Sequence, residues 1–177
     1  MHMATIVYVI AKNGFRDEEY FIPREVLVAA EHVVVTASNG EAGSAATGSR
    51  GREAHIDVNI GDVDIKKYDA VIYAGGPGAL ENLDNEQSHH IIRETVSARK
   101  LLGAICIAPT ILAKAGVLRG KKATVWSTPN EREGIAALQE NGAEYIDAPV
   151  VKDGSIITAS GPKAAQAFGE ALVSWFV

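Results

Sequence analysis

Leu101–Thr110 reads LLGAICIAPT and joins an apolar segment to the start of a helix. The continuous apolar run that ends at Ile105 is typical of a strand buried on both faces of a sheet. Pro109 is suited to the first turn of a helix, where its missing N–H costs nothing. The stretch therefore predicts a buried strand, a sharp turn at Cys106 and a helix that follows directly.

The same alternation of strand and helix runs along the whole chain. Short apolar runs predict strands at Thr5–Ile10, His32–Thr36, Ala70–Tyr73, Gly103–Ile105, Ala123–Trp126 and Ser155–Thr158. Longer stretches predict helices at Asp17–Ala30, Asn85–Lys100, Pro109–Ala115, Asn130–Asn141 and Pro162–Trp175. Such alternation indicates one α/β domain, residues 3–177, with a mainly parallel sheet between two layers of helices. Gly40–Gly51 is expected to be a long loop or a hairpin excursion, and Met1-His2 an addition ahead of a native start at Met3.

Composition excludes several classes of protein. The 177 residues carry a formal net charge of -5, which argues against a nucleic-acid-binding surface. No apolar stretch is long enough for a membrane span, and the start lacks the pattern of a secretory signal. A single cysteine leaves no intrachain disulfide and no zinc site built on thiolates. We expect a cytoplasmic protein that needs neither a cofactor nor a metal.

Cys106 occupies the turn between the strand and the helix. Ala104 and Ala108 flank it, and small residues at these positions suit a strained nucleophile turn in which strand and helix crowd together. The N–H groups at the start of the helix favour a thiolate, so we expect a depressed pKa and a reactive sulfur. A buried cysteine that acts only as a small hydrophobic residue is the alternative.

Histidine partners for Cys106 are hard to assign, because all five histidines precede it in the chain. The order Cys…His…Glu of the glutamine amidotransferases is therefore absent. His89 and His90 fall on a helix that is expected to be exposed, whereas His32 and His55 lie at or within predicted strands. The sequence assigns none of them to a catalytic dyad.

Three acids, Asp17, Glu18 and Glu19, follow the first strand at the start of a helix. Complementarity to the helix dipole accounts for all three. A more specific hypothesis is that one of them lies beside Cys106, where it would have to be protonated to coexist with a thiolate. Glu18 and Glu19 point about 100° apart on a helix, and the residue pattern alone does not choose between them.

Ala74–Leu83, AGGPGALENL, is a glycine-rich loop that follows another strand. Gly75 lets the backbone turn tightly and presents its N–H towards a neighbouring site. With the N–H of Ile107 it is expected to form an oxyanion hole beside Cys106. The glycine spacing fits a dinucleotide-binding loop poorly.

Four stretches together resemble the ThiJ/PfpI (DJ-1/PfpI) superfamily. They are the acidic turn that ends in Pro23, the AGGPGALENL loop, the segment AICIAPTILAKAGVLRG and the late VVKDGSIITASGP. The resemblance implies a flavodoxin-like three-layer sandwich and assembly as a homodimer or a higher homo-oligomer. It also implies that the glutamate four residues before a proline, here Glu19, contacts the nucleophile, with Gly75 and Ile107 as backbone donors.

Two departures from this family pattern guide the choice of reaction. Ile107 stands where the protease-like branch has histidine, and Thr128 precedes Pro129 where the deglycase and glyoxalase branch has histidine. We therefore expect a cofactor-independent enzyme acting on small reactive carbonyls, such as methylglyoxal converted to lactate, with Cys106 as nucleophile and Glu19 as acid–base. The first alternative is a non-turnover oxidative-stress sensor or chaperone that acts through oxidation of Cys106. The second is a peptidase or amidase that takes a histidine from another subunit.

Overall fold

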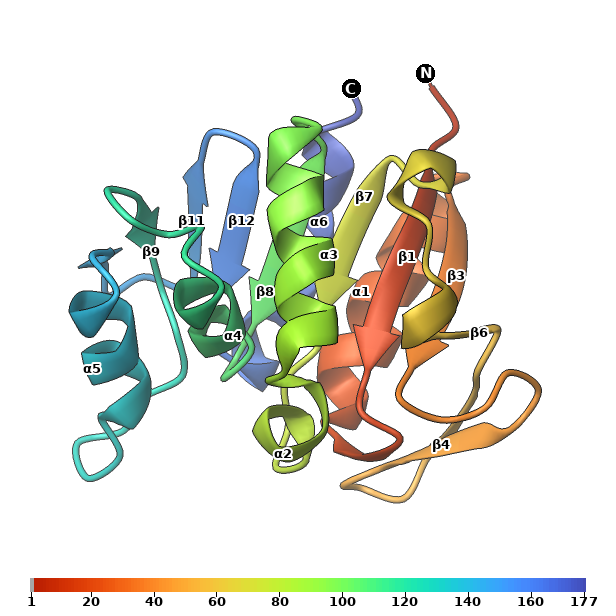
Figure 1. The fold of residues 1–177 in the computed structure, drawn as a ribbon, viewed down its shortest axis with the longest axis horizontal. Coiled ribbons are helices and arrows are strands. Elements are labelled where there is room, and N and C mark those ends of the chain that lie inside the picture. Colours follow the sequence, from red (N-terminus) through yellow and green to blue (C-terminus); the bar gives the residue numbers. More distant parts are fainter. Residues whose placement is uncertain (1) are drawn as a thin grey trace.

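Residues 2–177 are described by a computed structural model, and a seven-stranded sheet forms its centre (Figure 1). The strand order is β11-β12-β8-β7-β1-β3-β6, and every neighbouring pair is parallel except β11 with β12. The bounds are β1 Thr5–Ile10, β3 Val33–Ser38, β6 Val58–Asn59, β7 Ala70–Tyr73, β8 Leu101–Ile105, β11 Val150–Asp153 and β12 Ile156–Ala159. This is the mainly parallel α/β sandwich that the sequence predicts.

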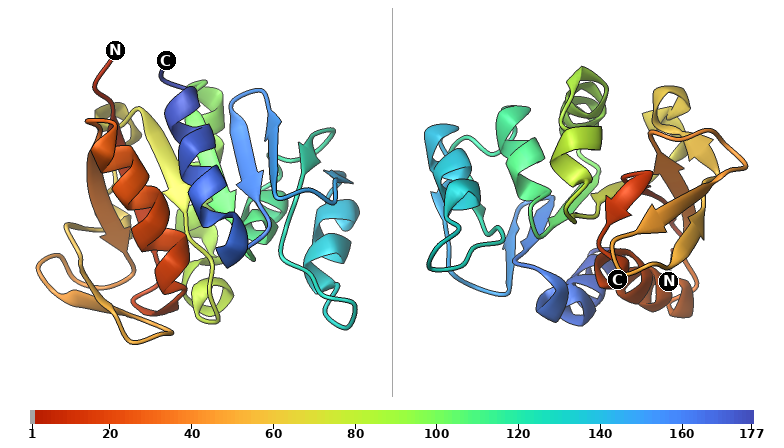
Figure 2. Two further views of the ribbon diagram at one scale, coloured as in Figure 1. Left: turned by 180° about the vertical axis from the view of Figure 1, so that it is seen from behind. Right: turned by 90° about the horizontal axis from the view of Figure 1, so that it is seen from below.

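Helices cover both faces of this sheet. α1 (Asp17–Ala29) packs beside α6 (Ala165–Ser174) on one face (Figure 2), while α3 (Glu86–Ser97) and α4 (Pro109–Lys114) cover the other (Figure 1). Gly103 in β8 permits close packing, since a Cβ there would lie 2.8 Å from Ile72 and 3.2 Å from the Phe168 ring. Within residues 2–177, no helix combines the length and the apolar character that a membrane crossing requires.

The topology fixes where a site is expected. The chain places β3 on one side of β1 and then returns to place β7 and β8 on the other side. Ligands of doubly wound sheets bind beyond the carboxyl ends of the strands where this direction changes. The loops after β1, β7 and β8 meet there, and they carry Glu19, the Gly75-Gly76 pair and Cys106.

The predicted strand Ala123–Trp126 is wrong in extent and in position. Only Lys122–Ala123 forms a strand, β9, and it pairs with β10 (Glu144–Tyr145) outside the central sheet. The edge beyond β12 is already occupied by β11, which the sequence did not predict. The next residues bond elsewhere: the N–H of Thr124 donates to the Thr158 side chain, and that of Trp126 donates to the carbonyl of Cys106.

Smaller elements complete the fold. The Gly40–Gly51 region supplies part of a hairpin, because β4 (Ala45–Gly48) pairs with β5 (Glu53–His55) and with β2 (Asn13–Phe15). The remaining elements are α2 (Ala79–Leu83), α5 (Glu133–Glu140) and the short 3-10 helices Ile60–Asp62, Ile65–Lys67 and Pro162–Ala164. α5 begins three residues later than predicted, because Thr128 and Glu131 form an isolated bridge before it.

Candidate active site

Cys106 lies on a strained turn at the end of β8. Its φ of 65° is in the left-handed region that a residue with a side chain rarely adopts, and such strain is common at functional sites. Two backbone hydrogen bonds hold the turn: the Cys106 N–H donates to Ala159, and its carbonyl accepts from Trp126 at 2.8 Å. Ala104 and Ala108 are fully buried against it, as the nucleophile-turn interpretation requires.

In the first turn of α1, the backbone carbonyl of Glu19 accepts a hydrogen bond from a side chain of the sheet in place of the usual helical one. Pro23, four residues later, has no N–H with which to bond the Glu19 carbonyl in the usual helical pattern. The Tyr8 hydroxyl on β1 donates to that carbonyl instead, at 2.5 Å. The glutamate–proline spacing thus has a physical meaning, since it ties the Glu19 backbone to the central sheet.

The Glu19 carboxyl and the Cys106 side chain meet at Gly75. A Cβ placed on Gly75 would lie 2.8 Å from the Cys106 Cβ and 2.9 Å from Oε1 of Glu19, so only glycine fits between them. Glu19 is fully buried, Cys106 is 9% exposed, and Glu18 points away to bond Arg16. The structure therefore brings Glu19, rather than Glu18, to the cysteine.

Burial controls the protonation of this pair. It raises the pKa of Glu19 to about 8, although Cys106, Arg16 and the Gly75 N–H act in the opposite direction. At neutral pH the carboxyl is mainly protonated and can act as a hydrogen-bond donor. Both of its oxygens lack a hydrogen bond of standard geometry within residues 2–177.

The expectation of a depressed pKa for Cys106 is wrong. Burial is the largest cause that raises the pKa of the thiol above its ordinary value, and the Glu19 carboxylate raises it further. The N–H of Ile107 and the charge of Arg16 lower the pKa, but they do not outweigh these two effects. Two negative charges cannot share so small a buried site cheaply, so the pair carries at most one at neutral pH.

The two predicted backbone donors differ in surroundings. Ile107 lines the pocket, and its N–H interacts with the Cys106 sulfur. The Gly75 N–H interacts with the Glu19 carboxyl, and Gly76 is the glycine that lines the pocket. Gly76 adopts a φ of 120°, and a Cβ there would lie 2.4 Å from the backbone nitrogen of Arg16.

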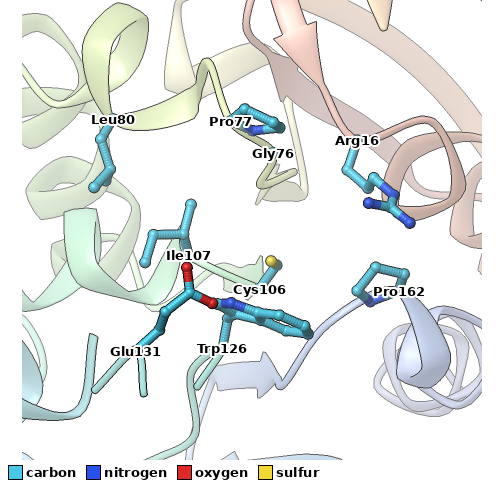
Figure 3. A pocket seen from close by; sticks show the side chains of 9 residues that line it. All are labelled: Arg16, Gly76, Pro77, Leu80, Cys106, Ile107, Trp126, Glu131 and Pro162. Carbon is cyan, nitrogen blue, oxygen red and sulfur yellow. The ribbon is translucent and has the colours of Figure 1, made fainter. Parts of the chain in front are cut away.

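A pocket of about 410 Å³ opens above the cysteine (Figure 3). Its wall combines apolar side chains with one basic and one acidic residue. The lining residues are Arg16, Gly76, Pro77, Leu80, Cys106, Ile107, Trp126, Glu131 and Pro162. The space suits a small ligand whose reacting atom approaches the sulfur.

Comparison with known proteins identifies the family and agrees with the fold. The sequence model of the DJ-1/PfpI family matches residues 5–175. The chain belongs to the DJ-1/PfpI family. It is 32% identical to a deglycase from Thermococcus kodakarensis, covering 88% of this chain and 90% of the relative, and 35% identical to protein dj-1beta of Drosophila melanogaster, covering 94% and 86%. Among solved structures, a ThiJ/PfpI domain protein from Brachyspira murdochii superposes with a TM-score of 0.90 at 25% identity, covering 99% of this chain and 98% of that one.

Histidine is absent from the pocket of this DJ-1/PfpI protein within residues 2–177. His32 is buried and accepts a hydrogen bond from the Ala4 N–H, whereas His55 and His90 are largely exposed. His89 is more buried than its helix pattern predicts, because it bonds Asp84 at 2.8 Å. The same described residues contain no cluster of three or more His, Cys, Asp or Glu side chains that suits a metal ion.

Several pocket residues of this DJ-1/PfpI protein are not predicted from the sequence, and they include the three polar or aromatic ones, Arg16, Trp126 and Glu131. The sequence does contain an indication for Arg16, because this residue directly precedes the acidic turn in the loop after β1, where a site is expected. The sequence pattern predicts a strand at Trp126 and a helix at Glu131, but both residues lie in the irregular segment between β9 and α5. That segment reaches the pocket because the Trp126 N–H bonds the Cys106 carbonyl.

Proposed function

We propose that this protein is a cofactor-independent cysteine enzyme that acts on small reactive carbonyls, in the manner of a glyoxalase or deglycase. One observation carries the proposal: a strained, pocket-lining cysteine lies against a buried carboxyl whose pKa is raised to about 8. A group with a pKa near the working pH exchanges protons efficiently in both directions. Names of relatives support the reaction class, since several are called deglycases.

The first step joins the cysteine to the substrate. Loss of one proton from the pair leaves a carboxylate on Glu19, because the pKa of the Cys106 thiol is raised further, and this carboxylate takes the thiol proton as the sulfur attacks. The sulfur adds to the aldehyde carbon of methylglyoxal, the electron pair of the C=O bond moves onto oxygen, and Glu19 supplies the proton. Backbone N–H groups of Ile107 and of the glycine loop, with Gly75 the predicted donor, stabilise the developing negative charge.

The second step is an internal oxidation and reduction. The Glu19 carboxylate removes the proton from the former aldehyde carbon, and an enediol forms. Return of a proton to the former ketone carbon gives a lactate thioester on Cys106, and water hydrolyses it to lactate and free thiol. The balance is methylglyoxal plus water to lactate, so no external oxidant or reductant is consumed.

Incubation of the pure protein with methylglyoxal at pH 7 tests the proposal. Lactate should accumulate above the blank, Cys106→Ser should abolish it, and Glu19→Gln should lower kcat by about 100-fold or more because proton transfer is lost. Glu25→Gln is the matched control, because Glu25 lies exposed on the same helix. Lactate production by Cys106→Ser at the wild-type rate would refute the assignment.

A second function is favoured by the protonated carboxyl beside the sulfur. Two equivalents of peroxide convert a thiol to a sulfinic acid with release of two waters, and the Glu19 proton is positioned to stabilise that product. An oxidative-stress sensor of this kind should gain two oxygen atoms by intact mass after mild peroxide, and Cys106→Ser should gain none. Rapid passage to the sulfonic acid would count against a sensor.

A further inference from the structure

Arg16 contributes a positive charge to the pocket that the reaction steps above do not use. It is the residue that precedes α1, and its backbone N–H donates to the Gly75 carbonyl at 3.0 Å. Its guanidinium Nε bonds Glu18 at 2.7 Å. Backbone and side chain are therefore both fixed beside the glycine loop, which limits the entropy that a ligand contact would cost.

The outer guanidinium nitrogens remain free to bind a ligand. Within residues 2–177, the side-chain hydrogen bond of Arg16 is made by Nε and neither Nη atom makes one, while the side chain lines the pocket and is partly buried. Figure 3 shows the guanidinium at the pocket edge, and in this view the Cys106 sulfur lies between it and the Glu131 carboxylate. An arginine with two free N–H donors in a partly dry pocket matches the geometry of a carboxylate.

The opposite wall sets the orientation of such a ligand. Glu131 is exposed at that wall, and its negative charge disfavours a carboxylate there. Leu80, Ile107 and Trp126 offer apolar contacts in the same pocket, and Figure 3 shows Trp126 between the two charged residues. A substrate that carries a carboxylate is thus directed towards Arg16, with its uncharged part against the apolar wall.

We propose that Arg16 is a specificity-determining residue that binds a carboxylate on the substrate. The preferred substrate class is then a 2-oxoaldehyde that carries a carboxylate, rather than a neutral compound such as methylglyoxal. This inference rests on the proposed function for its reaction, but it concerns recognition, which can be measured without turnover.

Alkylation of Cys106 measures the recognition directly. Iodoacetate and iodoacetamide react with the same thiolate by displacement of iodide, and they differ in that the first carries a carboxylate. The fraction of thiolate therefore cancels from the ratio of their rates, and the ratio reports how the pocket around the sulfur interacts with the carboxylate of iodoacetate. Arg16→Met should lower the iodoacetate-to-iodoacetamide ratio by about tenfold, which corresponds to about 1.4 kcal/mol.

Three further variants separate direct binding from other effects of charge. Arg16→Met frees Glu18, which would itself repel iodoacetate, so the double variant Arg16→Met/Glu18→Gln should keep the ratio low. Arg16→Lys should restore part of the ratio. Arg93→Met removes one exposed positive charge from α3 and should leave the ratio unchanged.

Two results would overturn the inference: an unchanged ratio in Arg16→Met, or a wild-type ratio in the double variant. Turnover provides a separate test with 4,5-dioxopentanoate and its neutral analogue 2-oxopentanal. The kcat/KM ratio of the two should fall about tenfold in Arg16→Met. If neither compound nor methylglyoxal is turned over, the proposed function fails, whereas the alkylation ratio still decides the role of Arg16.

Discussion

Replacement of Glu19 by glutamine should make the stability of the protein less dependent on pH. Glu19 is fully buried, and its pKa is raised to about 8 by that burial. In the unfolded chain the carboxyl titrates near 4.5. Between these values the folded state keeps a proton that the unfolded state has lost, so rising pH disfavours folding. Glutamine has nearly the same shape and no such titration.

The magnitude follows from the two pKa values. With one pKa unit worth about 1.36 kcal/mol, ionisation of the unfolded chain should cost the wild-type protein about 1 kcal/mol at pH 5 and about 3 kcal/mol at pH 7. Between these two pH values, Glu19→Gln should therefore gain about 2–3 kcal/mol in its free energy of unfolding relative to the wild type. Cys106 does not contribute, since its raised pKa keeps the thiol protonated in this range.

Urea unfolding at pH 5 and at pH 7, followed by circular dichroism, gives the required free energies. Glu25→Gln serves as the control, because an exposed glutamate on the same helix should show no comparable pH-dependent gain. A difference between Glu19→Gln and wild type that stays constant from pH 5 to pH 7 would refute the assignment of a proton to Glu19.

Other expected outcomes concern the cysteine and its supports. The rate of Cys106 alkylation by iodoacetamide should keep rising above pH 8.5, because burial raises the pKa of the thiol, and a plateau below pH 7 would contradict this. Tyr8→Phe should destabilise the protein by about 1–3 kcal/mol in urea unfolding, because the buried Glu19 carbonyl loses its hydrogen-bond donor. Gly76→Ala should cost at least about 1–3 kcal/mol by the same measurement, because a Cβ at φ 120° would meet the Arg16 nitrogen; unfolding at the wild-type urea midpoint would disprove that crowding.

Much of the fold could be predicted from sequence because its central strands are continuous apolar runs. Thr5–Ile10 and Ala70–Tyr73 were predicted with the bounds that the structure shows. Prediction failed at the sheet edge, where β11 has an alternating, partly exposed pattern and Ala123–Trp126 looks as apolar as a central strand. Which of two such segments pairs with β12 depends on long-range packing, which local pattern does not encode.

At the site, the contact between Glu19 and Cys106 could be predicted only through the family resemblance. The structure supplies the physical reason, which is that Pro23 frees a carbonyl for Tyr8 and thereby fixes the helix start. Helix N–H groups alone predict a depressed pKa for Cys106, whereas desolvation has the larger effect and raises it. Burial of a side chain is a property of the assembled fold, so the effect of desolvation on the pKa of Cys106 cannot be predicted from the sequence alone.

Within residues 2–177, no histidine lines the pocket, and the buried Glu19 carboxyl can take over the proton transfer that a histidine would perform. A histidine titrates near neutral pH without help, whereas a carboxyl must be desolvated to do so. Full burial of Glu19 raises its pKa to about 8, which gives this site a proton donor and acceptor in the same pH range. That burial costs the protein about 3 kcal/mol at pH 7, and natural proteins retain such a cost mainly where function requires it. If Glu19→Gln proves more stable at pH 7 and also inactive towards carbonyls, the destabilising carboxyl is there for its proton.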